Sequence, residues 1–370
     1  MVKELADMTQ RNYKVAHHVF RVRMEEPWGF ADITPEQEEV IRNLASGGDA
    51  GVIPVQADRL ADLKRNRRVF APGAGSRPAG PSRYNIDMSQ YEPFREDIAA
   101  EPLYTLDVKS GLPEDVACAR ENGTWKTVVR VEDNAPFYYG HLLGDRLVYE
   151  FFPEKSVCAA VLVIDPGMEH ATIYPNPAVG PTSVLLQIST SLMVLYTFRT
   201  ADKNTLLLHS SVIRHNGKAN LFFGISGTGK STHSRLWLEN IPGCDLMNDD
   251  NPVIRFMEGP DGKERVYVFG TPWSGKTYCY RNVSAPVRAL VRLERGSVNT
   301  ASRLTGLNAY ASVLAATSVI RWNSRNADEL LPVIEKVAMS VPCWVLGCTA
   351  EPEAARVCHD AIEGENKIEK

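Results

Sequence analysis

The segment that most constrains this chain is a glycine-rich stretch near the middle of its 370 residues. It fits the pattern G-x-x-x-x-G-K-[ST] at every fixed position, and its residues are Gly224, Ile225, Ser226, Gly227, Thr228, Gly229, Lys230 and Ser231, followed by Thr232. An apolar run at 219–223 precedes the stretch, and an expected helix at 231–239 follows it. Glycines let the backbone curl so that its N–H groups point at phosphate oxygens, and the helix start adds partial positive charge. The stretch therefore predicts a loop that binds the phosphates of ATP.

Two side chains at the end of this loop have predicted roles of their own. Lys230 is expected to hold the β- and γ-phosphates, and Ser231 to bind Mg²⁺. The alternative is a glycine turn with an incidental Lys-Ser pair, but that does not account for the position between a strand and a helix. ATP and Mg²⁺ are therefore the expected cofactors.

Composition places the chain among ordinary globular proteins with room for two domains, because 44% of its residues are hydrophobic and 23% are charged. The longest apolar runs, such as 159–164, fall short of the roughly 20 residues that cross a bilayer, so no membrane partner is expected. A net charge of -4 gives no general attraction for nucleic acid. Seven scattered cysteines without a C-x-x-C pair, and a charged N-terminus, favour a cytoplasmic setting.

The pattern of apolar runs changes along the chain, and we expect two domains. Residues 1–200 are predicted to form a β-rich domain, with short β-like runs between 102 and 175 and an apolar helix at 183–198. A segment rich in Gly, Pro and Arg at 69–83 is predicted to be a flexible loop. In residues 201–370 strands and helices alternate, which favours an α/β layer structure.

Two adjacent carboxylates, Asp249 and Asp250, follow a short apolar run. The two carboxylates of such a pair can have different roles, since one can hold metal while the other accepts a proton from an attacking hydroxyl. Adjacent side chains on a strand point to opposite faces, so the two are not expected to share one role. A plain turn is the alternative, because the segment is rich in turn formers. The candidate metal ligands are Ser231, Asp249 and Asp250, and which aspartate acts as base stays open.

The dipeptide Asn216-Gly217 predicts a tight hairpin, because both residues tolerate positive φ. With these two as the loop and no bulge, His209 pairs with Gly224, the first glycine of the phosphate loop. Cross-strand neighbours lie about 5 Å apart. His209 is therefore predicted to reach the reaction centre, although a lone histidine is usually structural.

A second stretch of small residues, at 270–277, follows an expected strand at 265–269. It offers a cation and an aromatic ring, which suit a second anion site or the edge of a nucleotide. The alternative is a Pro-Gly loop with a surface lysine. The candidate substrate or anion residues are Ser274, Gly275, Lys276 and Arg281.

Taken together, residues 209–212, the hairpin, the phosphate loop and the segment 248–250 resemble the catalytic core of HPr kinase/phosphorylase, within the phosphoenolpyruvate carboxykinase-like superfamily. The whole pattern, including the segments at 233–237 and 272–282, resembles more closely a set of HPr kinase-related bacterial proteins of poorly defined function. The resemblance covers about 205–365 and extends only weakly over the first 200 residues.

The resemblance implies an α/β fold, in which an HPr kinase-like P-loop catalytic domain is preceded by the β-rich N-terminal domain. His209, Lys230 and Ser231 match the family's positions, and Asp250 fits its catalytic base slightly better than Asp249. The family also has a metal-binding glutamate on the next strand, whereas 266–275 contains no acidic residue. Phosphorylation of HPr itself is therefore not expected.

These patterns predict an ATP- and Mg²⁺-dependent kinase that transfers the γ-phosphoryl group to a hydroxyl of an unidentified small molecule or peptide. Two alternatives stay open, a lyase of the phosphoenolpyruvate carboxykinase type and a non-catalytic ATP-binding regulator. The expected partners are a nucleotide and an unidentified phosphoryl acceptor. Whether the chain forms a homo-oligomer stays open.

Overall fold

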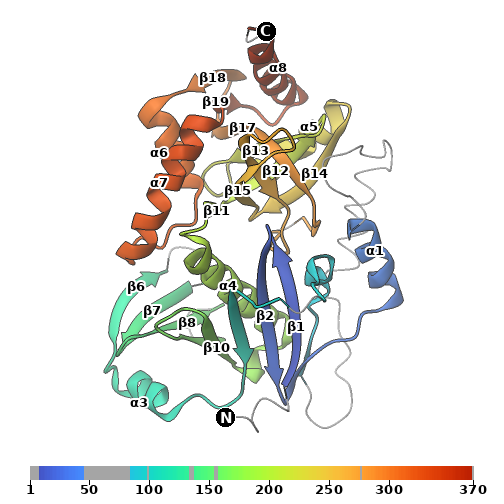
Figure 1. Cartoon of the computed structure of the whole chain (residues 1–370). Coiled ribbons are helices and arrows are strands. Elements are labelled where there is room, and N and C mark those ends of the chain that lie inside the picture. Colours follow the sequence, from blue (N-terminus) through green and yellow to red (C-terminus); the bar gives the residue numbers. More distant parts are fainter. Residues whose placement is uncertain are drawn as a thin grey trace. The chain divides into compact units, whose positions relative to one another are not determined.

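The computed structural model describes residues 8–45, 84–97, 100–132, 137–153, 157–275 and 277–368 (Figure 1). The predicted flexible segment at 69–83 and Lys276 lie outside the described residues. The described part is a mixed α/β structure with several sheets. The described residues divide into two compact units, one within Met1–Pro35 and Pro72–Arg199, the other within Glu36–Ala71 and Thr200–Lys370.

The first unit is built on an eight-stranded sheet with the order β1-β2-β5-β10-β9-β8-β7-β6. Its strands are β1 (Met8–Val15), β2 (His18–Glu25), β5 (Tyr104–Val108), β6 (Lys126–Val131), β7 (Phe137–Leu143), β8 (Arg146–Phe152), β9 (Ala160–Ile164) and β10 (His170–Pro175). Strand β5 pairs in parallel with β2 and β10, and the other pairs are antiparallel. Two short strands, β3 (Trp28–Phe30) and β4 (Tyr84–Ile86), pair separately.

The described helices of this part of the chain are α3 (Glu114–Asn122), α4 (Pro181–Thr200) and two 3₁₀ turns, η1 (Ser89–Phe94) and η2 (Pro177–Val179). Helix α1 (Pro35–Ala45) groups almost entirely with the second unit.

Helix α4 confirms the apolar helix predicted at 183–198 and extends it at both ends. Among the described helices it is the one long and apolar enough to cross a membrane by length and composition, but 56% of its most apolar stretch is buried within the protein. Three buried tyrosines hold it: the hydroxyl of Tyr91 bonds to Ser189, that of Tyr104 to the carbonyl of Leu192, and that of Tyr196 reaches a strand of the sheet. These contacts are typical of a core helix.

The second unit carries a nine-stranded sheet, in which β11-β15-β16-β17-β13-β12-β14 form one path and β19 joins β17 to β18. The strands are β11 (Thr205–Leu207), β12 (Ser210–His215), β13 (Lys218–Phe223), β14 (Cys244–Asp250), β15 (Val253–Glu258), β16 (Glu264–Phe269), β17 (Ser284–Arg295), β18 (Thr300–Leu304) and β19 (Cys343–Cys348). The helices are α5 (Lys230–Asn240), α6 (Gly306–Ala316), α7 (Ser324–Ser340) and α8 (Pro352–Ile368). The unit is a mixed α/β structure, as the sequence predicts, but the elements do not alternate strictly, because β14 to β18 follow one another without a helix and α6 and α7 are consecutive.

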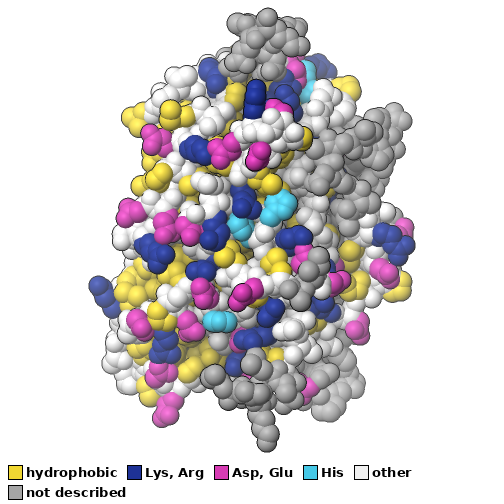
Figure 2. Space-filling model, viewed as in Figure 1, with side chains coloured by type: hydrophobic (Ala, Val, Ile, Leu, Met, Phe, Trp, Pro, Cys, Tyr) yellow, Lys and Arg dark blue, Asp and Glu magenta, His cyan; other side chains and the backbone are white. Residues whose placement is uncertain are grey.

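Alternation along the strands sends side chains into two cores, one on each face of this sheet. On β13, Leu221 and Phe223 pack in a core with α6 and α7, whereas Phe222 packs in a second core with α5 and α8. Two helices thus cover each face, the usual arrangement for a central sheet of this kind. Side chains of both charge signs are interspersed on the face shown in Figure 2, in keeping with the small net charge.

The predicted hairpin is present between β12 and β13. Asn216 and Gly217 take φ values of 50° and 74°, as a two-residue turn requires. The chain before this hairpin forms two short strands rather than one. β11 pairs with β15 and β12 pairs with β13 and β14, so the chain changes partner at Leu208 and His209.

A buried histidine, His233, helps to fix the position of helix α5, which follows the phosphate loop. The indole Nε1 of Trp237 donates to Nε2 of His233 at 3.1 Å, and the His233 ring packs edge-on against Phe222 with centroids 4.7 Å apart. Burial lowers the pKa of His233 to about 4. A neutral imidazole is therefore part of the packing that fixes this helix.

We expect the second unit to lose stability as pH falls from about 6.5 to 4 because of His233. Its folded pKa lies below the unfolded value, so the unfolded state binds the proton more tightly and the stabilisation is complete only above about pH 6.5. The loss amounts to roughly 3 kcal/mol. Denaturant unfolding at several pH values should show a smaller fall in His233→Gln than in the wild type or in His170→Gln, whose histidine is exposed. An equal fall in the free energy of unfolding with pH in all three proteins would contradict this role of His233.

Candidate active site

Strand pairing brings His209 beside the phosphate loop. Ser210 lies opposite Phe223 in the ladder of β12 and β13, which is the register that the sequence predicts. His209 and Gly224 follow directly beyond this last pair, and the backbone N–H of His209 donates to the carbonyl of Ala316 at 2.7 Å. The histidine therefore sits where β12 begins and the loop after β13 starts.

The loop itself has the backbone shape that its glycines predict. Gly227 and Gly229 have φ values of 81° and 106°, which side chains other than glycine rarely allow, and α5 begins at Lys230. A Cβ atom on Gly224 would lie 2.9 Å from the carbonyl oxygen of Leu293, so glycine is also needed there for close packing. The ammonium of Lys230 turns back along the loop and donates to the carbonyl of Gly224 at 3.2 Å. The first turn of α5 thus leaves its N–H groups available to an anion.

Strand β14 brings the two aspartates to the same place by pairing with the other edge of β12. Ser211 lies opposite Asp249, and Ser210 lies opposite Asp250. The pairing shifts by one residue further along, where Met247 is the extra residue of a bulge. Because a shift of one residue exchanges the two faces of a strand, this bulge decides which aspartate faces the loop.

The two carboxylates make different contacts, and Asp250, with a φ of 141°, departs from regular strand geometry. Asp249 is buried, and the hydroxyl of Ser231 donates to its Oδ1 at 3.1 Å. Asp250 is half-buried, and its Oδ1 lies 3.2 Å from Nδ1 of His209. One aspartate is therefore joined to the phosphate loop and the other to the histidine.

Burial and neighbouring charges shift the pKa values of this group. Burial raises the pKa of Asp250; His209 opposes that shift and the carboxylate of Asp249 adds to it. Burial lowers the pKa of His209 in spite of the nearby Asp250. Burial also lowers the pKa of Lys230, although both aspartates act in the other direction. Such shifts are typical of functional sites, although structural ion pairs produce them too.

Of the four predicted substrate or anion residues, the structure places Ser274 and Gly275 against the aspartates. The Ser274 hydroxyl and the Gly275 N–H donate to the carbonyl of Asp249 at 3.0 and 2.6 Å. A Cβ atom on Gly275 would come within 3.1 Å of the Asp250 side chain. These two residues thus hold the backbone at the end of β14.

Arg281 has a different partner from the one that the sequence suggests. Its Nη1 donates to Asp245 at 2.5 Å and to the carbonyl of Leu246 at 2.7 Å, and Asp245 is also bound by both Nε and Nη2 of Arg214. Burial alone would raise the pKa of Asp245, but the two arginines outweigh it and lower that pKa. The Arg281 charge is therefore used in a largely buried ion-pair cluster. Lys276 lies outside the described residues, so its predicted role stays a prediction.

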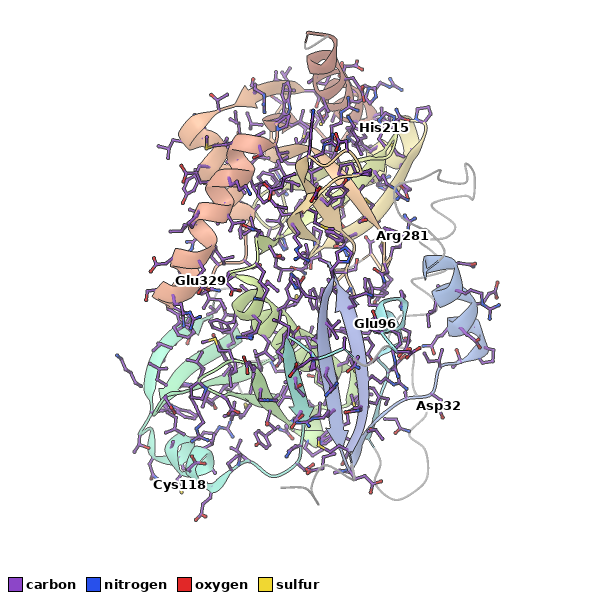
Figure 3. The ribbon with its side chains drawn as sticks, in the orientation of Figure 1. Asp32, Glu96, Cys118, His215, Arg281 and Glu329 are labelled. Atoms are coloured by element: carbon purple, nitrogen blue, oxygen red, sulfur yellow. The ribbon has the colours of Figure 1, made fainter. Side chains whose placement is uncertain are left out.

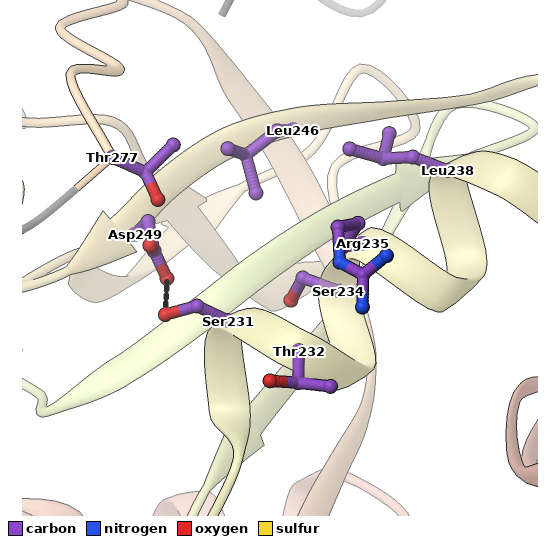
Figure 4. Close-up of a pocket in the computed structure, with 8 residues that line it drawn as sticks. All are labelled: Ser231, Thr232, Ser234, Arg235, Leu238, Leu246, Asp249 and Thr277. Carbon is purple, nitrogen blue, oxygen red and sulfur yellow. Dashed lines mark hydrogen bonds between the residues drawn. The ribbon is translucent and has the colours of Figure 1, made fainter. Parts of the chain in front are cut away.

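A pocket of about 250 Å³ opens beside the contact between Ser231 and Asp249 (Figure 4). In the close-up the hydroxyl of Ser231 and the carboxylate of Asp249 meet on the left, and Leu246 and Leu238 lie along the upper side. The lining residues are Ser231, Thr232, Ser234, Arg235, Leu238, Leu246, Asp249 and Thr277. The pocket thus joins polar groups of the loop to an apolar wall.

Sequence reasoning did not identify Arg295 or Thr271, although both support the site. Arg295 ends β17, and its Nη2 donates to the carbonyl of Gly227 at 2.6 Å. The hydroxyl of Thr271 accepts a hydrogen bond of 3.2 Å from the side-chain amide of Asn248, the residue before the two aspartates. β17 runs parallel to β13, and the carboxyl ends of parallel strands meet at one edge. That rule places Arg295 beside the loop once the strand order is known.

Comparisons with known proteins add little to this geometry. No family model matches the chain, and no curated protein matches it in sequence. Among solved structures, the chain is similar to one described as the structure of the Hpr(Ser) kinase/phosphatase from Coxiella burnetii. The match has 13% sequence identity and a TM-score of 0.26, and it covers 44% of this chain and 99% of that one. It suggests only a distant structural relationship and carries no functional argument.

Two glycines with similar backbone geometry allow a matched test of the phosphate loop. Gly227 and Gly217 have φ values of 81° and 74°, and a Cβ atom on either would meet nothing within 4 Å. Alanine at either position should therefore cost about 1–2 kcal/mol of backbone strain. We expect Gly227→Ala to weaken the binding of a fluorescent ADP analogue about tenfold. Gly217→Ala, in the distant hairpin turn, should bind it like the wild type. Equal affinities for all three proteins would contradict a phosphate-binding role for the loop.

Proposed function

We propose that the second unit is an ATP- and Mg²⁺-dependent kinase that transfers the γ-phosphoryl group to a hydroxyl of a small molecule or peptide. The observation that carries this proposal is the pair of contacts beside the loop, Ser231 with Asp249 and His209 with Asp250. Phosphoryl transfer depends mainly on positioning and on neutralisation of charge, so a few well-placed groups suffice.

The groups around Ser231 suit a magnesium ion. Its hydroxyl and the Asp249 carboxylate lie 3.1 Å apart, and Mg²⁺ prefers oxygen ligands of these two kinds together with phosphate oxygens. When bound, the ion would neutralise charge on the β- and γ-phosphates. We therefore assign Ser231 and Asp249 to the metal, and leave Asp250 to the acceptor.

Asp250 is the group that we propose as general base. Its raised pKa brings it nearer to the working range of a base, and His209 fixes the orientation of its carboxylate. In the proposed step the acceptor hydroxyl gives its proton to Asp250, and its oxygen forms a bond to the γ-phosphorus. The bond between that phosphorus and the β,γ-bridging oxygen breaks, and ADP leaves with the electron pair. Lys230 and the loop N–H groups would stabilise the charge on the transferred group.

Labelled ATP tests this function even though the acceptor is unidentified. We expect the chain, incubated with γ-labelled ATP, Mg²⁺ and a cell extract, to label one class of small molecule or protein. Lys230→Ala should abolish the labelling, because the lysine binds the phosphates. Asp250→Asn should slow it by about 10²- to 10⁴-fold and leave ATP binding intact, because only proton transfer is lost.

The matched control for these variants is Asp261→Asn, which changes an exposed aspartate between β15 and β16. It should label the acceptor at the wild-type rate. Tight ATP binding with no labelled acceptor would contradict the kinase and favour a non-catalytic regulator. Formation of phosphoenolpyruvate from oxaloacetate and ATP would instead assign the site to a lyase.

A further inference from the structure

A second group of chemically active side chains lies at the opposite end of β12 from His209. His215 ends this strand, and His359 and Glu363 lie one turn apart on α8. One nitrogen of each histidine and one carboxylate oxygen lie within 4.8 Å of one another. Nδ1 of His215 is 3.6 Å from Oε1 of Glu363, and Nε2 of His359 is 4.0 Å from it. Figure 3 labels His215, which lies well apart from Arg281 in that view.

The two histidines are oriented so that a lone pair on each can face the same point. Nδ1 of His359 lies 3.0 Å from Oδ1 of Asp360, which fixes the proton there and leaves Nε2 free to accept. Nδ1 of His215 is buried without a hydrogen-bond partner among the described residues. Nε2 of His215 lies 3.2 Å from the amide of Asn216, which can accept the ring proton after a simple amide flip.

The carboxylate of Glu363 has a second contact that must be compatible with any ligand. Arg288 donates to both of its oxygens, at 2.5 and 2.8 Å. A carboxylate offers about four lone-pair sites, so this pairing leaves one on Oε1 toward the histidines. Carboxylates that bind metals are commonly hydrogen-bonded by other groups in this way. Arg288 therefore orients the carboxylate without using all of its capacity.

We propose that His215, His359 and Glu363 bind one zinc ion. Two imidazoles and a carboxylate form a donor set that suits Zn²⁺, with a fourth position for water. Zn–N distances of about 2.0–2.1 Å place tetrahedral ligands about 3.3 Å apart, so the observed separations need only small side-chain movements. The ion would join α8 to the β12–β13 hairpin. Trp237 of α5 contacts both histidine rings, which links this site to the helix that follows the phosphate loop.

The test uses the full chain, stripped with a chelator and kept in excess Mg²⁺ so that the phosphate site does not take up zinc. Calorimetric titration with Zn²⁺ should show one equivalent bound and a rise in Tm. Both should be lost in His359→Gln, whose imidazole is partly exposed. They should be retained in His170→Gln, which removes an exposed histidine of the first unit. Asp360→Ala changes a largely exposed side chain and should weaken zinc binding by about 10- to 100-fold.

Co²⁺ in place of Zn²⁺ gives an independent readout, because its visible absorption distinguishes nitrogen and oxygen ligands from thiolates. We expect a tetrahedral spectrum without a thiolate band. The proposal would be overturned if the wild-type protein bound no zinc, or if the His359→Gln variant still bound one equivalent of zinc. A thiolate band from one of the seven free cysteines would also overturn it. None of these outcomes depends on kinase activity.

Discussion

Strand β12 is paired on both sides, with β13 along one edge and β14 along the other, and the geometry of the candidate site depends on this double pairing. The first register places His209 beside the start of the phosphate loop. The second places Asp249 opposite Ser211 and Asp250 opposite Ser210. Three separate segments of the chain thus meet at one end of one strand. Helices on both faces bury this part of the sheet, so the hydrogen-bonded registers cannot slip without exposing core residues.

The parts of this site that could be predicted from sequence are those fixed by local chemistry. The glycine spacing predicts the loop because few other residues adopt the φ values seen at Gly227 and Gly229. Asn216 and Gly217 fix the hairpin turn and, through it, the register that places His209. Alternation along a strand predicts different contacts for two adjacent aspartates, but it does not predict the φ of 141° that Asp250 adopts at the end of β14.

The remaining parts depend on contacts between distant segments, which local patterns do not contain. The extra residue at Met247 shifts β14 against β12, and nothing in the sequence near it marks a bulge. Arg281 looks like an anion ligand by its position after the second loop, yet Asp245 binds it from the start of β14. Arg295 contacts the loop because β17 runs beside β13, a neighbour relation that only the sheet order reveals.

Metal affinity tests most directly whether Asp249 holds the metal while Asp250 serves the acceptor, as we propose. Mn²⁺ can replace Mg²⁺, and electron paramagnetic resonance measures the free ion in the presence of ATP. The contacts predict that Asp249→Asn weakens Mn²⁺ binding about tenfold or more, because a charged ligand is lost. Asp250→Asn should bind Mn²⁺ nearly as the wild type does. Equal losses in the two variants, or a larger loss in Asp250→Asn, would contradict the claim.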